Sequence, residues 1–358
     1  MNGAIRRLAA AAVPVLTLLF PGCKYPDPVP PEPLHADPRN FTWTIDTIAL
    51  PGSPATLMRS IWGSSPRDVY VAGHNDMPAG TMFHYDGISW RKVNLTVAEG
   101  GAIQGVVDIS QVFGFTPAYV FAAGGVAGSL TPGSPARSLV IRFDGSSWSM
   151  MQVPPGGMLR ALWGLYQSDM WAAGDSGTMI YSQGLAWYQG IFPGTTAVTS
   201  LSGVSADDIY ALSSRSDSGV HDTTFRYLWH WNGGVWSVAD SFAQVVGQQD
   251  RFGSRSLWSL LGITYTCGMG VFRRAGTGWV RTLPSSPGGY LNAIYGTANN
   301  SLFVAGEGSA LYYVNEAGSY RYATFSDPAI NFYGVWTGGG EAFVVGNDAR
   351  RTYVLHGR

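Results

Sequence analysis

A unit of about 46 residues recurs along the chain, and it limits the possible folds more than any other feature of the sequence. The first copy has Trp-Gly at 62–63, Asp-Val-Tyr-Val-Ala-Gly at 68–73 and Asp-Gly-Ile-Ser-Trp at 86–90. The same order returns at 163–164, 169–174 and 184–187. An aromatic residue closes each of six copies: Trp90, Trp148, Trp187, Trp236, Trp279 and Tyr320. This period is typical of the blades of a β-propeller.

Each unit contains four short stretches that favour β-strands. The first ends near Trp-Gly, and the second is a β-branched and aromatic run that ends at Ala-Gly. The third precedes Asp-Gly, which favours a hairpin turn because Gly and Asp tolerate positive φ. The fourth starts near the closing aromatic residue. The sequence therefore predicts an all-β fold, a seven-bladed β-propeller over residues 41–358.

The two ends of the repeat region complement each other. The seventh unit stops at Arg358 and lacks the strand that carries the closing aromatic residue, whereas 41–47, which contains Trp43, is such a strand with no blade before it. We expect the segment around Trp43 to pair with the last blade and close the ring, which removes open sheet edges.

Residues 1–40 differ in character from the repeats. Arg6 and Arg7 precede the 13 uncharged residues from Leu8 to Phe20, which are too few to span a bilayer and fit a secretory signal. A small residue, Gly22, then precedes Cys23. This pattern resembles the bacterial lipoprotein cleavage box, and the resemblance implies a signal peptide over 1–22, with Cys23 lipidated and acyl chains holding the protein to a membrane. Lys24 is not Asp, which by the same resemblance indicates the outer membrane.

Residues 23–40 form the predicted tether. Six prolines stand in it: Pro26, Pro28, Pro30, Pro31, Pro33 and Pro38. Proline lacks a backbone N–H, so such a segment favours extended polyproline geometry and at ~3.1 Å per residue reaches about 50 Å.

Composition excludes several classes of protein. Charged residues are 13% of the chain and aromatic residues another 13%, which excludes general disorder. The 22 basic and 23 acidic residues give no electrostatic signal for nucleic acid. With Cys23 lipidated, Cys267 has no partner, and its strand-like surroundings predict a buried thiol.

No motif for catalysis or metal binding is evident, so we predict no cofactor and no metal. The six histidines form no His-x-x-x-His pair, and no nucleophile elbow or phosphate loop is present. His84, His230 and His356 recur at similar positions in their units, which favours a structural role over a site.

Loop lengths point to one face of the ring. Long connections are predicted at 74–80, 126–137, 213–226 and 237–255, all on the same side. Long loops on a rigid scaffold commonly carry function. The candidate binding residues on them are His74, Asp76, Arg215, Asp217, His221, Asp222 and Arg251. That these insertions are merely solvated is an equal alternative.

Over 41–358 the repeats resemble kelch and Asp-box propellers. Gly124-Gly125 with Phe143 and Trp148 follows the kelch pattern, and Asp86-Gly87 and Asp144-Gly145 approach the Asp-box. Such propellers vary in function, so the resemblance implies the fold rather than an activity.

The sequence thus favours a membrane-tethered propeller of the bacterial envelope that binds a protein or a glycan through its loop-rich face. A scaffold of an envelope complex is a related reading. The alternative is a secreted carbohydrate-active hydrolase or lyase with its site at the mouth of the ring, which requires two carboxylates about 5–9 Å apart.

Overall fold

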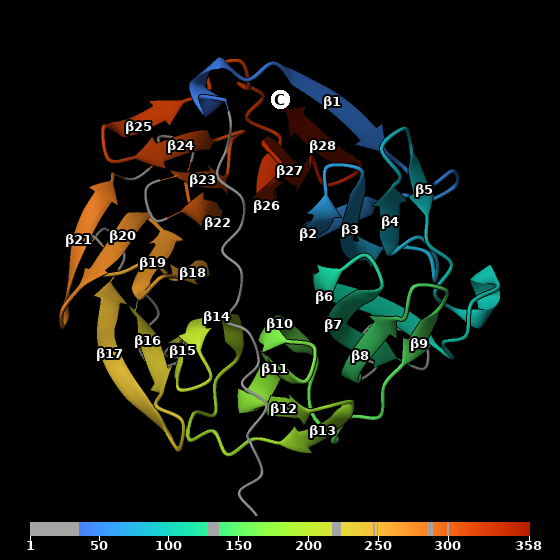
Figure 1. Cartoon of the computed structure of the whole chain (residues 1–358), viewed down its shortest axis with the longest axis horizontal. Helices are drawn as coiled ribbons and strands as arrows, with labels where there is room; N and C mark the ends of the chain where they lie inside the picture. Colours follow the sequence, from blue (N-terminus) through green and yellow to red (C-terminus); the bar gives the residue numbers. More distant parts are fainter. Residues whose placement is uncertain are drawn as a thin grey trace, which may run out of the picture.

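Each repeat folds into one four-stranded antiparallel sheet, and seven such sheets stand in a ring around a central axis (Figure 1). The computed structural model describes residues 36–127, 136–216, 223–245, 248, 250–284, 286, 289–298 and 301–358. The predicted seven-bladed propeller is therefore confirmed. Cys23 and most of the predicted tether lie outside the described residues.

Within each sheet the strands follow one another from the axis outward. Blades one to four are β2 (Thr56–Ser65), β3 (Asp68–Asn75), β4 (Met82–Tyr85), β5 (Trp90–Lys92); β6 (Val106–Thr116), β7 (Tyr119–Ala127), β8 (Arg137–Phe143), β9 (Trp148–Met150); β10 (Leu159–Tyr166), β11 (Asp169–Gly174), β12 (Met179–Gln183), β13 (Ala186–Gln189); and β14 (Val198–Ser205), β15 (Asp208–Ser216), β16 (Thr223–Trp231), β17 (Trp236–Val245). Blades five to seven are β18 (Ser256–Leu260), β19 (Ile263–Gly268), β20 (Gly270–Ala275), β21 (Gly278–Leu283); β22 (Leu291–Ala298), β23 (Ser301–Gly306), β24 (Leu311–Asn315), β25 (Gly318–Arg321); and β26 (Asn331–Gly338), β27 (Glu341–Asn347), β28 (Thr352–Gly357), β1 (Trp43–Ile48).

The ring closes through β1, as the sequence predicts. β1 pairs antiparallel with β28, in a register that runs from Trp43 opposite Gly357 to Ile48 opposite Thr352. The outer strand of blade seven thus comes from the opposite end of the repeat region, and every blade is complete.

The core lies between neighbouring blades, where the second and third strands are covered on both faces. In β3 the side chains of Val69, Val71 and Ala72 are fully buried, as expected for strands that read as continuous apolar runs. Cys267 in β19 is also fully buried, and burial raises the pKa of its thiol. Its predicted place in the core is correct.

The Asp-Gly turns join the third and fourth strands. The Asp86 carboxylate accepts hydrogen bonds from the backbone N–H groups of Ile88 and Ser89, and Gly87 takes φ +89°. At the same place in blade two, backbone N–H donors from Ser147 and Ser146 and the Ser146 hydroxyl lower the pKa of Asp144 to about 2. These carboxylates therefore stabilise their own turns as hydrogen-bond acceptors.

The three recurring histidines have structural partners. His84 and His230 contact Asp68 and Asp208, with N···O distances of 2.6 and 2.9 Å, and His356 contacts Glu341 in the same way. Each ring also packs against the aromatic side chain of the second strand, as His84 does against Tyr70 at 4.3 Å between centroids. These contacts tie the third strand to the start of the second.

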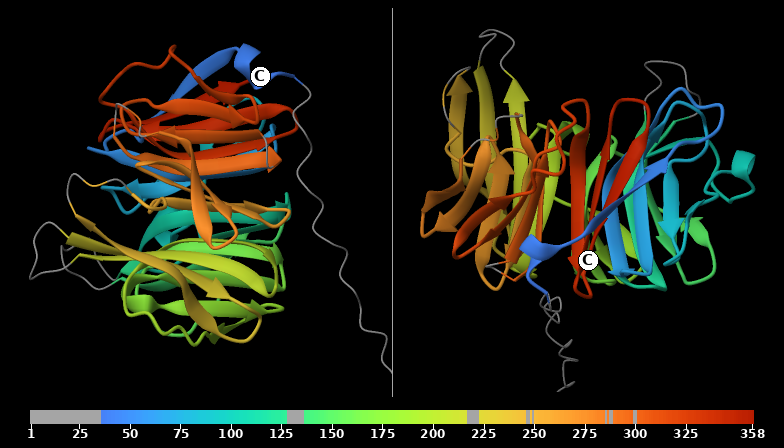
Figure 2. Two further views of the ribbon diagram at one scale, coloured as in Figure 1. Left: turned by 90° about the vertical axis from the view of Figure 1, so that its left-hand side faces the viewer. Right: turned by 90° about the horizontal axis from the view of Figure 1, so that it is seen from above.

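The two faces of the ring differ. Connections between second and third strands and links between blades lie on one face, which we call the loop-rich face, while the short turns between first and second and between third and fourth strands lie on the opposite turn face (Figure 2). β1 starts on the turn face, after the 3₁₀ turn η1 (Pro38–Asn40), and ends towards the loop-rich face.

Two predicted long connections are largely strand, contrary to expectation. In blade four Ser213–Ser216 pair with 224–227, and β17 continues to Val245, so these strands project on the loop-rich face (Figure 2). Each strand continues because its neighbour supplies backbone hydrogen bonds beyond the ring. Short 3₁₀ turns, η2 (Val97–Glu99) and η3 (Asp175–Gly177), occur in loops. Within the described ranges, no helix is long and apolar enough to cross a membrane.

Candidate functional site

The inner strands of all seven blades surround a central channel of about 860 Å³. Its wall consists of β2, β6, β10, β14, β18, β22 and β26. Because each inner strand pairs on only one side, its other edge faces the channel and presents backbone N–H and C=O groups. The volume of the channel is within the range typical of ligand sites.

Three arginines line this channel at equivalent positions, three residues before the inner-strand tryptophan. They are Arg59, Arg160 and Arg255, in blades one, three and five, and all are exposed. Because inner strands begin at the loop-rich face, these side chains lie at the mouth on that face. Ser110, Thr199, Asn292 and Tyr333 occupy the same position in the other blades.

The three arginines differ in their partners. Arg160 donates two hydrogen bonds to the Asp175 carboxylate, at 3.0 Å each, and this contact raises the pKa of Arg160. The guanidinium of Arg59 lies 5.4 Å from the ring centroid of Tyr333, and that of Arg255 lies 4.4 Å from Tyr290. No contact with a carboxylate is recorded for Arg59 or Arg255 among the described residues. Two arginines at the mouth therefore keep their charge unpaired.

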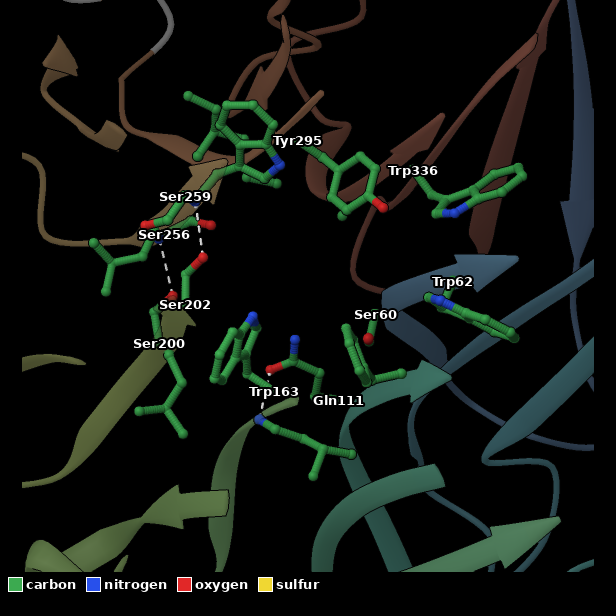
Figure 3. Close-up of a pocket in the computed structure, with 18 of the residues that line it drawn as sticks. Ser60, Trp62, Gln111, Trp163, Ser200, Ser202, Ser256, Ser259, Tyr295 and Trp336 are labelled. Carbon is green, nitrogen blue, oxygen red and sulfur yellow. Dashed lines mark hydrogen bonds between the residues drawn. The ribbon is translucent and has the colours of Figure 1, made fainter. Parts of the chain in front are cut away.

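Side chains from one blade cap the open edge of the next. Ser60, Gln111 and Ser200 occupy the same position, one residue after the mouth position. Their oxygens accept hydrogen bonds from the N–H groups of Val112, Leu162 and Leu257 at 2.9, 3.1 and 2.9 Å (Figure 3). These N–H groups are also equivalent to one another. The caps satisfy polar groups that the sheets leave open and join neighbouring blades.

An aromatic belt lies closer to the turn face. Six blades contribute to it: Trp62, Phe113, Trp163, Trp258, Tyr295 and Trp336, while blade four has Ser202 (Figure 3). A Cβ atom placed on Gly114 would lie 2.7 Å from Trp62, and one on Gly203 would lie 2.8 Å from Trp163. These two glycines, which follow Phe113 and Ser202, thus make room for the preceding blade's tryptophan.

The structure brings two predicted site residues together. His74 lies between Asp76 and Asp108, with N···O distances of 3.2 Å to each. The hydrogen bond with Asp108 raises the pKa of His74 most, burial lowers it, and Asp76 raises it further. This cluster joins blade one to blade two on the loop-rich face.

The other predicted residues are apart from this cluster. Arg215 is an exposed strand residue of β15, with its guanidinium 5.1 Å from the Phe225 ring. Arg251 lies beside Asp240, with an N···O distance of 3.3 Å. Blade one and blades four and five stand on opposite sides of the ring (Figure 1), so these residues do not form one site with His74 and Asp76. Asp217, His221 and Asp222 lie outside the described residues.

The sequence reasoning missed the channel residues, although a signal for them exists. Arg-x-x-Trp occurs at 59–62, 160–163 and 255–258, in three alternate blades. A comparison of the residues three positions before each inner-strand tryptophan would have found these arginines. Our prediction of the site relied on loop length instead.

The described lining of the channel is cationic, polar and aromatic. No carboxylate lines the channel among the residues that the structure describes, and in these ranges no group of three metal-ligating side chains is suited to a metal ion. The arrangement offers donors, positive charge and aromatic surface, which suit recognition of an anionic or amphipathic group.

A second groove of about 650 Å³ lies between blades one and two and includes Tyr70, His84 and Trp148. Its titratable groups, Asp68 and His84, already contact each other. It therefore presents less unpaired charge than the central channel.

Comparison with known proteins supports the fold alone. No family model and no curated protein matches the sequence. Among solved structures the chain is similar to YCF48 bound to D1 peptide (TM-score 0.61, 15% identity, 91% of this chain and 98% of that chain). YCF48 from Cyanidioschyzon merolae gives a TM-score of 0.57 at 14% identity, with 87% and 98% covered. The extracellular domain of the putative one component system BT4673 from B. thetaiotaomicron gives 0.58 at 13% identity, with 86% of this chain and 39% of that chain covered.

Proposed function

We propose that this chain is a lipid-anchored propeller of the bacterial envelope, at the outer membrane, that binds a protein partner through its loop-rich face. One observation carries the proposal: the channel mouth with its unpaired arginines and the projecting blade-four strands share a face. Arg and aromatic residues are enriched at protein interfaces.

The direction in which the chain enters the ring supports an orientation with the loop-rich face away from the membrane. β1 starts on the turn face, after η1, so a tether would reach the ring from that side. An anchor at Cys23 would then leave the loop-rich face directed away from the membrane and accessible to a partner.

The solved structure of YCF48 with a D1 peptide is an example of a similar ring that binds a polypeptide. At 15% identity it supports the plausibility of peptide binding and not the same partner. The kelch and Asp-box resemblance stays a prediction about the repeats.

A photo-crosslinking amino acid at Arg215 tests the face, with Ile88 on the turn face as the matched position. Ile88 is 88% exposed, so both sites are accessible. In intact envelopes we expect a discrete crosslinked protein from position 215 and none from 88. Replacement of Asp217, His221 and Asp222 by Ala should weaken that crosslink without lowering the melting temperature. Equal crosslinking from both faces would contradict the proposal, and a periodate-sensitive product would indicate a glycan.

The anchor has its own test. We expect metabolic labelling with a palmitate analogue to mark the wild-type chain, and Cys23→Ala to abolish both the label and sedimentation with outer membranes. Cys267→Ala is the control, because that thiol is buried in blade five. An unlabelled wild-type chain would remove the anchor from the proposal.

The hydrolase or lyase alternative receives less support. It requires a pair of carboxylates at the mouth, and no described lining residue of the channel is Asp or Glu. On the loop-rich face, Asp108 contacts His74 and Asp175 contacts Arg160.

A further inference from the structure

We infer that the channel contains a carboxylate-binding site where blade seven meets blade one, formed by the Arg59 guanidinium and the backbone N–H groups of Ile61 and Val335. This inference goes beyond the proposed function, because it concerns a ligand group in the isolated ring and requires neither the anchor nor the protein partner.

The two N–H groups are equivalent to ones that are capped elsewhere. Ile61 and Val335 occupy the same register in their inner strands as Val112 and Leu257, opposite Val71 and Val344. In Val112 and Leu257 this N–H points to the channel side and donates to a serine of the preceding blade.

The caps are absent for a chemical reason at two successive junctions, between blades six and seven and between blades seven and one. The residues at the cap position before Val335 and Ile61 are Ala293 and Gly334, whose side chains contain no hydrogen-bond acceptor. Two neighbouring strands, β26 and β2, therefore each present an uncapped donor to the channel. A buried or half-buried N–H without an acceptor costs free energy that a ligand oxygen recovers.

Close packing keeps the site open. A Cβ atom placed on Gly334 would lie 2.9 Å from the carbonyl oxygen of Arg59 and 3.1 Å from Ile61. A serine at Gly334 would therefore not fit without movement of β2. The junction of blades seven and one thus excludes the cap that blades two, three and five receive.

A positive charge lies on the same strand, closer to the mouth of the channel than these donors. Arg59 is two residues before Ile61 in β2, and Tyr333 is two residues before Val335 in β26, with the guanidinium 5.4 Å from the tyrosine ring centroid. No carboxylate contact is recorded for Arg59 among the described residues. Arg160 differs, because it forms an ion pair with Asp175. The stacked tyrosine restricts the guanidinium and leaves its N–H edge for a ligand.

The donor set favours a carboxylate. Two backbone N–H groups and one planar guanidinium match a planar group with two oxygens and one negative charge. Trp336 and Trp62, which follow the donors in β26 and β2 (Figure 3), are buried between blades. The half-buried Tyr333 ring in the channel lining is the apolar surface available to the organic part of the acid. A peptide carboxylate, terminal or from a side chain, has this combination.

Titration of the ¹⁵N-labelled full chain with N-acetyl-Gly-Gly-Leu tests the site. We expect saturable shifts of the amide signals of Ile61 and Val335, with little change at the capped amides of Val112 and Leu257. The C-terminal amide of the same peptide should bind at least tenfold more weakly. N-acetyl-Gly-Glu-Gly-amide separates the two sources, because its binding would assign the site to side-chain carboxylates as well.

Two matched pairs of variants separate the site from folding. Arg59→Gln should weaken binding at least tenfold, whereas Arg350→Gln, which removes the same charge from the exposed β27–β28 connection on the same face, should not. Ala293→Ser supplies the missing cap for Val335 and should weaken binding several-fold without a change of charge. Ala161→Ser is its control, because it caps Leu201 in a different part of the ring. Melting temperatures confirm folding of each variant.

Three results would overturn the inference: no shift at Ile61 and Val335, equal affinity for the acid and its amide, or tighter binding of inorganic phosphate than of both peptides. A positive titration with no partner crosslink, or the reverse, would separate this inference from the proposed function.

Discussion

Trp43 and Gly357 are register partners in the last sheet, and the indole covers the glycine so closely that a Cβ atom at 357 would lie 2.8 Å from the ring. The indole also packs edge-on against Tyr322 of blade six, at 5.2 Å between centroids. The strand that closes the ring is thus held both to its own blade and to its neighbour.

Gly357→Ala should therefore destabilise the closed ring. The added methyl must displace the Trp43 indole, and overpacking of this kind costs about 1–3 kcal/mol. Urea unfolding measures the loss. Gly278→Ala is the control, because a Cβ at Gly278 has no atom closer than 3.8 Å. Equal stability of the two variants would contradict the role given to this contact.

Ser60→Ala should loosen the junction between blades one and two. It removes the acceptor of the Val112 N–H, a loss of about 1 kcal/mol. Hydrogen exchange of the Val112 amide should become faster. Ser319→Ala, which changes an exposed serine of β25, should leave that exchange rate unchanged. An unchanged rate in Ser60→Ala as well would show that the cap does not stabilise this junction.

The fold was readable from the sequence because Trp43 and the six later aromatic residues mark the outer strands at a regular interval. Closure followed from one missing strand at the C-terminal end. Local sequence patterns were sufficient to predict the blades, since every blade is the same four-stranded antiparallel sheet.

The candidate site was harder to predict from the sequence because its hydrogen-bond donors depend on contacts between blades. Whether the Val335 N–H is capped depends on Ala293 in another blade, and no local pattern relates the two. Loop length also predicted Arg215 in a loop, whereas it lies on a paired strand. The recurring Arg-x-x-Trp was available in the sequence and indicates the channel better than the loops do.

His74 should make the blade one–two junction sensitive to pH. Its pKa is raised chiefly by the Asp108 hydrogen bond, so its stabilising effect is complete below the unfolded value of about 6.5 and is lost as pH rises through the folded pKa. Asp108→Asn should lower the pKa of His74, measured by NMR titration of the imidazole. Asp207→Asn, on the turn face, is the control, and an unchanged His74 pKa in Asp108→Asn would refute the pairing.

Glu99 should have the opposite pH dependence, because it organises the link between blades one and two as an anion. Its carboxylate accepts hydrogen bonds from the N–H groups of Gly80 and Thr96, at 2.8 and 3.1 Å, and lies 3.3 Å from the Lys92 ammonium. Burial raises the pKa of Glu99, but these donors outweigh it and the net shift is downward.

The stabilisation from Glu99 is therefore present above the unfolded pKa of about 4.3 and is lost as pH falls through the lower folded value. Glu99→Gln should cost about 2 kcal/mol at neutral pH, since hydrogen bonds to a charged group are replaced by weaker ones. It should also accelerate hydrogen exchange at Gly80 and flatten the acid limb of the stability curve. The exposed Glu316→Gln should do neither, and a normal acid limb in Glu99→Gln would assign the acid sensitivity to other carboxylates.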